Sequence, residues 1–183
     1  MKVVQTELDG VVLVESEVFR DGRGFFLESY NQRKYREAGI DAEFVQDNHS
    51  RSARNTIRGL HAQQLHPQGK LVRVIAGSIF DVVVDIRRGS PKYAHWIGIR
   101  LAADNFTQCY MPPGYAHGFC VLSDVAEIEY KCTDFYYPDD ELHIIWSDPD
   151  IGISWPIAQP VLSDKDRDGQ RLRDLTDRLP IFK

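Results

Sequence analysis

Short runs of hydrophobic residues alternate along this chain with clusters of Gly, Pro, Asp and Asn, a pattern typical of proteins built from β-strands. Between the first two runs, the pair Asp21-Gly22 is a strong signal for a hairpin turn. Many short strands at this spacing predict a jelly-roll or a related small β-barrel, whose mouth is a usual place for a small-molecule site. The expected strands are Val11–Phe19, Gly24–Tyr30, Leu71–Ile75, Ile79–Ile86, His95–Leu101, Thr107–Met111, Phe119–Leu122, Ala126–Thr133 and His143–Trp146.

Helical signals are few. Asn31–Ala38 predicts a short helix with Asn31 near its N-cap and Gly39 just past its end, and Asp168–Leu175 predicts a second. The run Ile79–Ile86 is apolar apart from two acids, which fits a strand with one face in a core and the other lining a cavity or an edge. We find no repeat or linker and expect residues 1–183 to form a single domain, mostly β, with a short helical tail at the carboxy terminus.

Composition narrows the range of partners. The 183 residues are 43% hydrophobic and 27% charged, as in ordinary globular proteins, and the formal net charge is -5. A chain with this charge does not attract polyanions, so we expect no nucleic-acid partner and expect any phosphate to be held by locally placed cations.

Three cysteines without CxxC spacing fit reduced residues of a cytoplasmic protein. The segment Met1–Glu7 has neither the apolar core nor the cleavage site of a signal peptide. No segment approaches the roughly 20 apolar residues that a membrane span needs. We therefore expect no membrane association and a cytoplasmic location.

Several segments contain more charged and polar side chains than a sheet requires, but each segment has a structural explanation when taken alone. Arg23 and Glu28 could form an ion pair across a hairpin, and Gln46-Asp47-Asn48 could be a polar turn. A single His among apolar neighbours is more often structural than catalytic. We expect a structural role for His49, His66, His95 and His143.

The combination of these segments favours a functional site. Arg58 and His61 lie three residues apart around Gly59, which permits a tight turn or a close approach to a ligand. Lys70 begins an apolar strand, where the sequence leaves open whether it faces the barrel interior or solvent. His117 stands in a Gly-x-x-His-Gly setting where the chain must fold sharply.

Small β-barrels often bind a metal ion through two histidines and a carboxylate. Metal-binding cupins usually carry His-x-His with a Glu a few residues on, whereas this chain has His61-Ala62-Gln63 with no Glu in the next turn. Gln is a poor ligand, so we expect a metal-free site.

Taken together, these segments resemble the dTDP-4-dehydrorhamnose 3,5-epimerase family of metal-free cupins. The resemblance runs from about Val11 to Asp166 and implies a cupin-type jelly-roll β-barrel. The matching motifs are Asp21–Phe26 with Glu28, Phe44–Asn48, Arg58–His61, Gln68–Val72, Phe80–Arg87, Ala116–Phe119, Tyr130, Glu141 and Leu162–Asp166.

The resemblance implies roles for individual residues. His61 would be the general base, oriented by Asp166, with Tyr130 as the proton donor on the opposite face of the sugar and Lys70 beside the enolate oxygen. No cofactor is implied. A dTDP-linked 4-keto-6-deoxy sugar would be held by Arg23, Glu28, Gln46, Asn48, Arg58, His117, Glu141 and Lys165. The family is a homodimer that exchanges amino-terminal strands, so Arg23 and Glu28 would serve the partner's site, and Phe26 offers an aromatic face for the pyrimidine base.

The chemistry fits these residue types. A proton beside a ketone needs a base on one face, an acid on the other and a cation at the oxygen, and His has an unperturbed pKa of roughly 6.5, close to working pH. Two alternatives stay open: a related single-centre 3- or 5-epimerase or 3,4-ketoisomerase, and a cupin that binds a sugar or nucleotide without catalysis.

Overall fold

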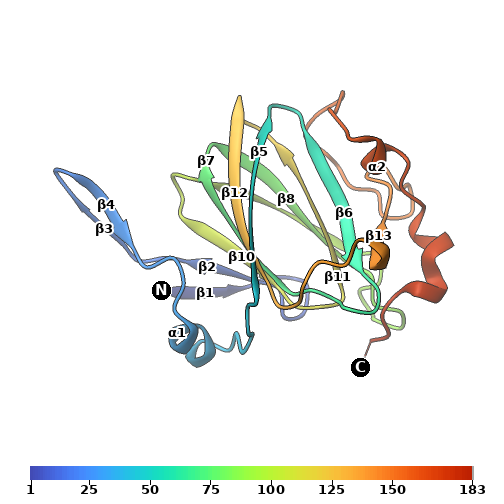
Figure 1. The fold of residues 1–183 in the computed structure, drawn as a ribbon, viewed down its shortest axis with the longest axis horizontal. Helices are drawn as coiled ribbons and strands as arrows, with labels where there is room; N and C mark the ends of the chain where they lie inside the picture. The colour runs from blue at the N-terminus through green and yellow to red at the C-terminus, as the bar shows by residue number, and fades with distance from the viewer. Residues whose placement is uncertain (183) are drawn as a thin grey trace.

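A computed structural model describes residues 1–182, which fold into two facing antiparallel sheets and a separate hairpin (Figure 1). The strands are β1 (Lys2–Gln5), β2 (Val12–Glu15), β3 (Val18–Asp21), β4 (Gly24–Leu27), β5 (Gln46–Ala53), β6 (Ile57–Gln63), β7 (Lys70–Ala76), β8 (Ser78–Asp85), β9 (Trp96–Ala102), β10 (Thr107–Met111), β11 (Tyr115–Val121), β12 (Val125–Cys132) and β13 (Glu141–His143). The helices are α1 (Gln32–Glu37) and α2 (Asp164–Arg167), with 3₁₀ turns at Pro138–Asp140 and Leu172–Arg178.

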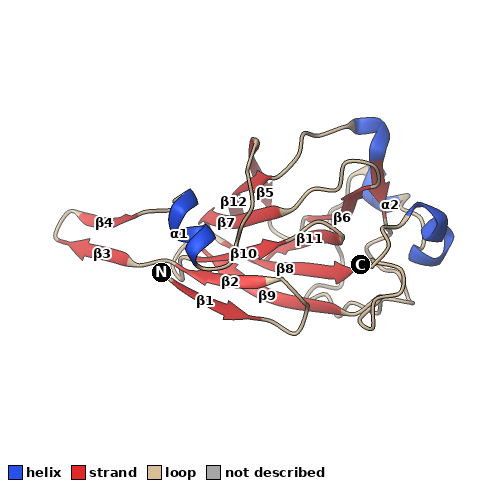
Figure 2. Cartoon of the chain, turned by 90° about the horizontal axis from the view of Figure 1, so that it is seen from below, coloured by secondary structure: helices blue, strands red, loops and turns tan. Residues whose placement is uncertain are grey.

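The predicted jelly-roll class is confirmed, although the two sheets pack face to face and do not close into one continuous barrel. The six-stranded sheet has the order β1-β2-β10-β7-β12-β5, and the five-stranded sheet has the order β13-β6-β11-β8-β9. The hairpin of β3 and β4 stands away from both sheets (Figure 1). The helical segments lie outside the two sheets (Figure 2). None of the helices within residues 1–182 is long and apolar enough to cross a membrane.

The hydrophobic core fills one part of the space between the sheets. Val72 and Ile128 from the six-stranded sheet meet Ile79 and Val121 from the five-stranded sheet, all at 0–1% exposure. The outer faces are covered as well. Leu172, Leu175 and Leu179 of the carboxy-terminal segment pack on the five-stranded sheet, and α1 with the segment after it packs on the six-stranded sheet.

Strand β8 is apolar because both of its faces are buried. Val82 and Val84 face the carboxy-terminal segment, whereas Ile79 and Val83 face the inter-sheet core. The remaining length of the inter-sheet space is open, and there the strands carry polar side chains. This division of the same strands into a core end and a polar end positions the site.

Several predicted elements are confirmed with changed bounds. The helix expected at 31–38 is α1, and the Asn31 side chain caps it by accepting from the Lys34 N–H. The Asp21-Gly22 signal marks the hairpin, in which Asp21 pairs with Gly24. The strand expected at 11–19 is interrupted between β2 and β3, where the chain leaves the sheet.

The helix expected at 168–175 is wrong in part. Helical structure is found before it, in α2, and from Leu172 onward, but Gln170 between them bridges to Ile144. The Ile145 N–H donates to the Gln170 carbonyl at 2.8 Å, and the Gln170 N–H donates to the His143 carbonyl at 2.9 Å. These sheet-like bonds satisfy the backbone at that point, so a continuous helix does not form.

Candidate active site

A cavity of about 330 Å³ between the two sheets gathers most of the polar side chains that the sequence singled out. Strands of both sheets contribute, so the cavity has two polar walls. Its lining includes Gln46 and Asn48 of β5, Arg58 and His61 of β6, Lys70 of β7, His117 of β11, Tyr130 of β12 and Glu141 of β13.

His61 is hydrogen-bonded to Asp166, whose Oδ1 lies 2.6 Å from the His61 Nε2. Asp166 is 6% exposed, and its other oxygen accepts from the Ser163 hydroxyl at 2.6 Å. Burial raises the pKa of Asp166, but hydrogen bonds from His61, Ser163 and the Gly59 N–H outweigh it and lower the pKa to about 2. The carboxylate is therefore ionised at neutral pH and accepts a hydrogen bond from the imidazole Nε2–H.

Gly59 explains how β6 brings His61 and Asp166 together. Its φ is +126°, and a Cβ at this position would lie 2.5 Å from the Gly118 Cα of β11. Only glycine permits this approach of the two strands. The same residue donates its backbone N–H to Asp166 Oδ1 at 3.1 Å, so the backbone of β6 helps to hold the acid beside His61.

Lys70 faces the cavity, which settles the choice that the sequence left open. Its Nζ lies 5.9 Å from the centre of the Tyr130 ring, and no carboxylate within residues 1–182 pairs with it. Burial lowers the pKa of the Lys70 ammonium and raises the pKa of the Tyr130 phenol. The site thus holds a desolvated amine next to a phenol that stays protonated at neutral pH.

His117 projects into the cavity from β11 and is braced by Asp81 of β8. The His117 Nε2 lies 2.7 Å from Asp81 Oδ1, and Asp81 is fully buried. The acid that interrupts the apolar pattern of β8 is therefore a partner of a cavity histidine.

The rim of the cavity is a connected set of polar groups. Lys165 Nζ donates to Glu141 Oε2 at 2.5 Å, and the Tyr136 hydroxyl donates to the same oxygen at 2.9 Å. The Tyr136 N–H also donates to Gln46 at 3.0 Å. Tyr136 is 45% exposed, so its ring offers a flat face at the mouth.

Gln63, which stands where metal-binding cupins carry a histidine, has a bracing role. Its amide donates to the His66 and Phe135 carbonyls at 2.7 and 3.1 Å, and its oxygen accepts from the Tyr137 N–H at 2.8 Å. These bonds fix the loop that carries Tyr136.

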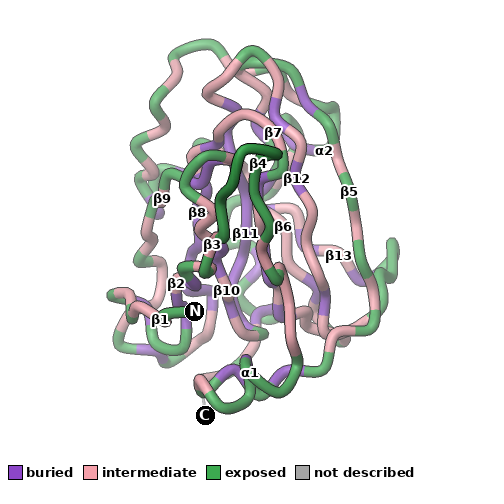
Figure 3. The backbone as a smooth tube through the Cα atoms, turned by 90° about the vertical axis from the view of Figure 1, so that its left-hand side faces the viewer, coloured by how far each residue is buried: buried purple, intermediate pink, exposed green. Residues whose placement is uncertain are grey.

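Arg23, Phe26 and Glu28 do not line this cavity. Arg23 pairs with Asp21 in the hairpin, and Glu28 pairs with Lys34 at 2.9 Å. Phe26 is 69% exposed on β4. Figure 3 shows most of the hairpin as exposed. In one chain, these three predicted residues are therefore apart from the other predicted site residues.

The sequence did not single out Tyr136, Asp81 or His143 as site residues. Tyr136 belongs to the aromatic run Phe135-Tyr136-Tyr137, and such a run just before a proline was an available signal. Asp81 was visible as a buried-strand acid without a partner. His143 gave no signal, because its neighbour His61 is close across the sheet and distant along the chain.

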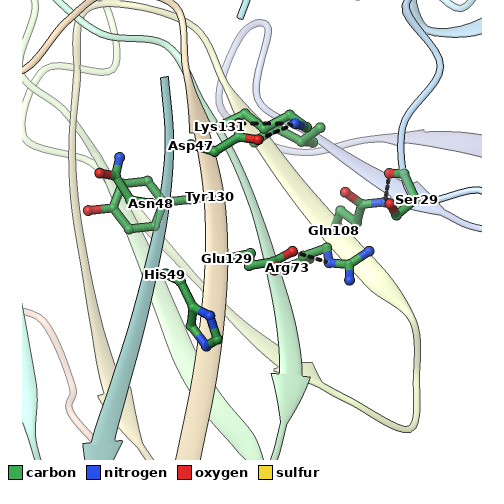
Figure 4. Close-up of a pocket in the computed structure, with 10 residues that line it drawn as sticks. Ser29, Asp47, Asn48, His49, Arg73, Gln108, Glu129, Tyr130 and Lys131 are labelled. Carbon is green, nitrogen blue, oxygen red and sulfur yellow. Dashed lines mark hydrogen bonds and ion pairs between the residues drawn. The ribbon is translucent and has the colours of Figure 1, made fainter. Parts of the chain in front are cut away.

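A second cavity, of about 340 Å³, lies on the opposite face of the six-stranded sheet (Figure 4). Tyr130 and Asn48 point to one side there, and their sequence neighbours point to the other. Its charges pair with one another, Lys131 with Asp47 at 2.9 Å and Arg73 with Glu129 at 3.3 Å. We therefore place the chemistry in the first cavity.

Comparison with known proteins agrees with this geometry. The family model described as dTDP-4-dehydrorhamnose 3,5-epimerase matches residues 5–174. The dTDP-4-dehydrorhamnose 3,5-epimerase of Pseudomonas aeruginosa is 53% identical over 176 residues, covering 95% of this chain and 97% of the relative. The dTDP-4-dehydrorhamnose 3-epimerase of Streptomyces niveus is 37% identical, covering 100% of this chain and 90% of the relative.

A solved structure is similar over the whole chain. It is the dTDP-6-deoxy-D-glucose-3,5-epimerase of Legionella pneumophila in complex with dTDP-4-keto-L-rhamnose. It matches with a TM-score of 0.97 at 44% identity and covers 100% of this chain and 98% of its own. The resemblance seen in the sequence is thereby confirmed, and the chain belongs to the dTDP-4-dehydrorhamnose 3,5-epimerase family.

Proposed function

We propose that this chain inverts C3 and C5 of dTDP-4-dehydro-6-deoxy-D-glucose to give dTDP-4-dehydro-L-rhamnose. One observation carries the proposal. His61, held by Asp166, and Tyr130 line a single cavity from opposite sheets, and Lys70 lies beside Tyr130. A base and an acid on opposite walls, with a cation between the sheets, are what inversion beside a ketone requires.

The base in this mechanism is the Nδ1 of His61. Asp166 is ionised and holds the imidazole proton on Nε2, so the Nδ1 lone pair is free. Nδ1 takes the proton from the carbon next to the ketone, and the C–H electron pair forms an enolate with its charge on the C4 oxygen. The imidazolium that results is stabilised by Asp166, as in other His–Asp pairs.

The acid in this mechanism is the Tyr130 phenol. Because burial raises its pKa, the phenol carries its proton at neutral pH and can deliver it to the opposite face of the enolate. The carbon is then inverted, and exchange with water returns a proton to Tyr130 and removes one from His61. Lys70 stabilises the enolate oxygen electrostatically. No electrons are gained or lost overall, so the cycle needs no redox cofactor.

The nucleotide and sugar are held by the remaining residues of the cavity and its rim. Arg58 and Lys165 supply local positive charge for the diphosphate, which the net charge of -5 does not supply. The sugar hydroxyls contact Gln46, Asn48, His117 and Glu141. Tyr136 offers an exposed ring at the mouth for the pyrimidine base, in addition to the expected Phe26.

We infer that the active form is a homodimer in which the β3–β4 hairpin reaches the partner's cavity. The hairpin stands away from its own chain (Figure 1) and exposes Phe19, Phe25 and Phe26 at 57%, 59% and 69%. Exposed aromatic side chains in this number mark an interaction surface. Docking on a partner would cover them and bring Arg23 and Glu28 to a site that neither residue reaches in its own chain.

We also infer a reducing compartment, the cytoplasm. The three cysteines Cys109, Cys120 and Cys132 are all free and buried.

Inversion at a single centre is the second candidate, because the Streptomyces niveus relative is named a 3-epimerase. Incubation with dTDP-4-dehydro-6-deoxy-D-glucose in D₂O, followed by NMR of the sugar, separates the candidates. Deuterium with inversion at both C3 and C5 supports the proposal, and deuterium at one centre supports a single-centre enzyme. Absence of deuterium from the sugar would leave only a binding function.

A further inference from the structure

His143 is a cavity-facing neighbour of His61 that the proposed reaction does not use. The two residues are paired across β13 and β6, and their rings lie 5.3 Å apart, edge to face. The His143 Nε2 lies 3.2 Å from Glu141 Oε2. Its Nδ1 is buried and makes no hydrogen bond within residues 1–182.

The three side chains have the donor set of a metal centre and lie close to one another. Donor atoms of His61, Glu141 and His143 all lie within 4.8 Å of one another. Two ligands bound to one tetrahedral Zn²⁺ at about 2.0–2.1 Å lie roughly 3.4 Å apart. The separation of 3.2 Å between His143 Nε2 and Glu141 Oε2 is close to that value. Two imidazoles and one carboxylate are also a common ligand set for divalent transition metals.

Asp166 completes the arrangement from outside. It holds the Nε2 of His61 at 2.6 Å and leaves Nδ1 free. A carboxylate bonded to the second nitrogen of a metal-binding histidine is the usual outer partner in zinc sites, because it fixes the tautomer and raises the basicity of the ligand. The lone pair that serves as the base is therefore also the lone pair offered to a metal.

The present neighbour of Glu141 is the Lys165 ammonium, whose side chain is 54% exposed. Because Lys165 is long and open to solvent, it can leave Glu141 when a divalent ion arrives. The Glu141 carboxylate would then face an ion of charge +2 in place of the singly charged ammonium group.

The spacing of His61 and Gln63 predicts no resident metal, but His143 supplies a second imidazole from another strand. We propose that His61, Glu141 and His143 bind one divalent transition-metal ion, with Zn²⁺ as the best match, and that the bound ion inhibits the enzyme by occupying the base. The binding part stands on geometry alone, and the inhibitory part rests on the proposed function.

The binding test uses calorimetric titration of the chelator-treated full chain with Zn²⁺ alone. We expect one tight site in the wild type. Loss of a residue that only supports a metal ligand weakens binding by up to about 100-fold. Because His143 is a direct ligand in this proposal, His143→Asn should weaken Zn²⁺ binding by more than that. His49→Asn is the matched control: His49 also lies beside a carboxylate, Glu127 at 3.3 Å, but on the outer sheet face, and its loss should leave the affinity unchanged.

Glu141→Gln is a second variant, used in case His143→Asn unfolds, and it should weaken Zn²⁺ binding as well. Co²⁺ gives an independent readout, since binding to a site with two imidazoles and a carboxylate intensifies its visible absorption relative to the hydrated ion. Equal Zn²⁺ affinity in the wild type, His143→Asn and Glu141→Gln would overturn the proposal.

Inhibition is then measured as the Zn²⁺ concentration that halves deuterium exchange into the nucleotide sugar, with reversal by EDTA. We expect this concentration to follow the calorimetric affinity. Exchange that continues at full rate with the site saturated would overturn the inhibitory part. Failure of the metal-free enzyme to exchange at all would overturn the proposed function, and the calorimetric result would still decide the binding part.

Discussion

Asp166 orients the His61 ring through its bond to Nε2, and several hydrogen bonds hold Asp166 itself in place. Its two oxygens accept from His61, Ser163 and the Gly59 N–H, and the helix turn α2 carries it. These bonds favour the ionised form of Asp166, and its pKa is lowered from 3.8 to about 2. At the residue scale, the dyad is therefore also a source of folding stability.

This preference predicts a pH dependence of stability. A carboxyl group with a depressed pKa in the folded state stabilises the fold above its unfolded pKa, and the contribution is lost as the pH falls through the folded pKa. A shift from 3.8 to about 2 corresponds to about 2 kcal/mol. We expect the difference in unfolding free energy between the wild type and Asp166→Asn to shrink by about this amount from pH 5 to pH 2. Urea unfolding at each pH measures it, and a constant difference would contradict the prediction.

Tyr130→Phe separates proton removal from inversion. The variant keeps His61 and its partner, so the enolate still forms, but the opposite face loses its proton donor. Return of a solvent-equilibrated proton from His61 then gives exchange without inversion. We expect deuterium to enter the sugar faster than the inverted product appears, as measured by NMR. Equal loss of exchange and inversion would mean that Tyr130 is needed for proton removal itself.

Sequence motifs brought several cavity residues to light because these motifs lie on strands that face the same space. His61, Lys70 and Tyr130 all line the cavity. His143 was assigned no role because adjacency across β6 and β13 depends on register, which the chain order does not reveal. The same reason hid Asp81 as the partner of His117.

At the scale of elements, β6 is shaped by its contact with β11. The approach at Gly59 brings a hypothetical Cβ within 2.5 Å of the Gly118 Cα, whereas a Cβ at Gly152 would contact nothing within 4 Å. Both glycines have positive φ, at +126° and +68°. They therefore form a matched pair in which one change adds a backbone clash and the other does not.

We expect Gly59→Ala to destabilise the fold by at least about 3 kcal/mol, from the unfavourable φ and the clash together. Gly152→Ala should cost about 1–2 kcal/mol, from the φ alone. Denaturant unfolding of both variants measures the difference. A Gly59→Ala variant no less stable than Gly152→Ala would contradict the role of this contact.

Strands β5 and β6 were not among the predicted strands for the same physical reason that makes them functional. Gln46, Asn48, Arg58 and His61 replace the apolar residues that would alternate along an ordinary buried strand. Hydrophobic periodicity therefore fails where a strand lines a polar cavity. It succeeded for β8 and β12, which carry the core.

At the scale of the whole molecule, the single chain leaves Arg23, Phe26 and Glu28 away from the cavity. Sequence motifs indicate which residues belong to a family's site, but they carry no information on which copy of the chain completes it. The exposed hairpin in Figure 3 carries these three residues, and its partner in the assembly could not be predicted from the sequence.

Complementation between two inactive variants tests the exchange of hairpins. His61→Asn removes the base, and Arg23→Ala with Glu28→Ala removes the hairpin contacts. In a mixed dimer, one site receives an intact base from one chain and an intact hairpin from the other. We expect epimerase activity to return after the two variants are unfolded and refolded together, and not when each is refolded alone. No recovery, despite mixed dimers, would show that each chain completes its own site.

The central claim is that His61 removes the proton next to the ketone. Deuterium exchange into dTDP-4-dehydro-6-deoxy-D-glucose, compared between the wild type and His61→Asn, tests it most directly. The account predicts that His61→Asn loses exchange at both C3 and C5 by at least about 10²–10⁴-fold, the usual contribution of a general base, while dTDP affinity changes little. Exchange by His61→Asn at the wild-type rate would contradict the account.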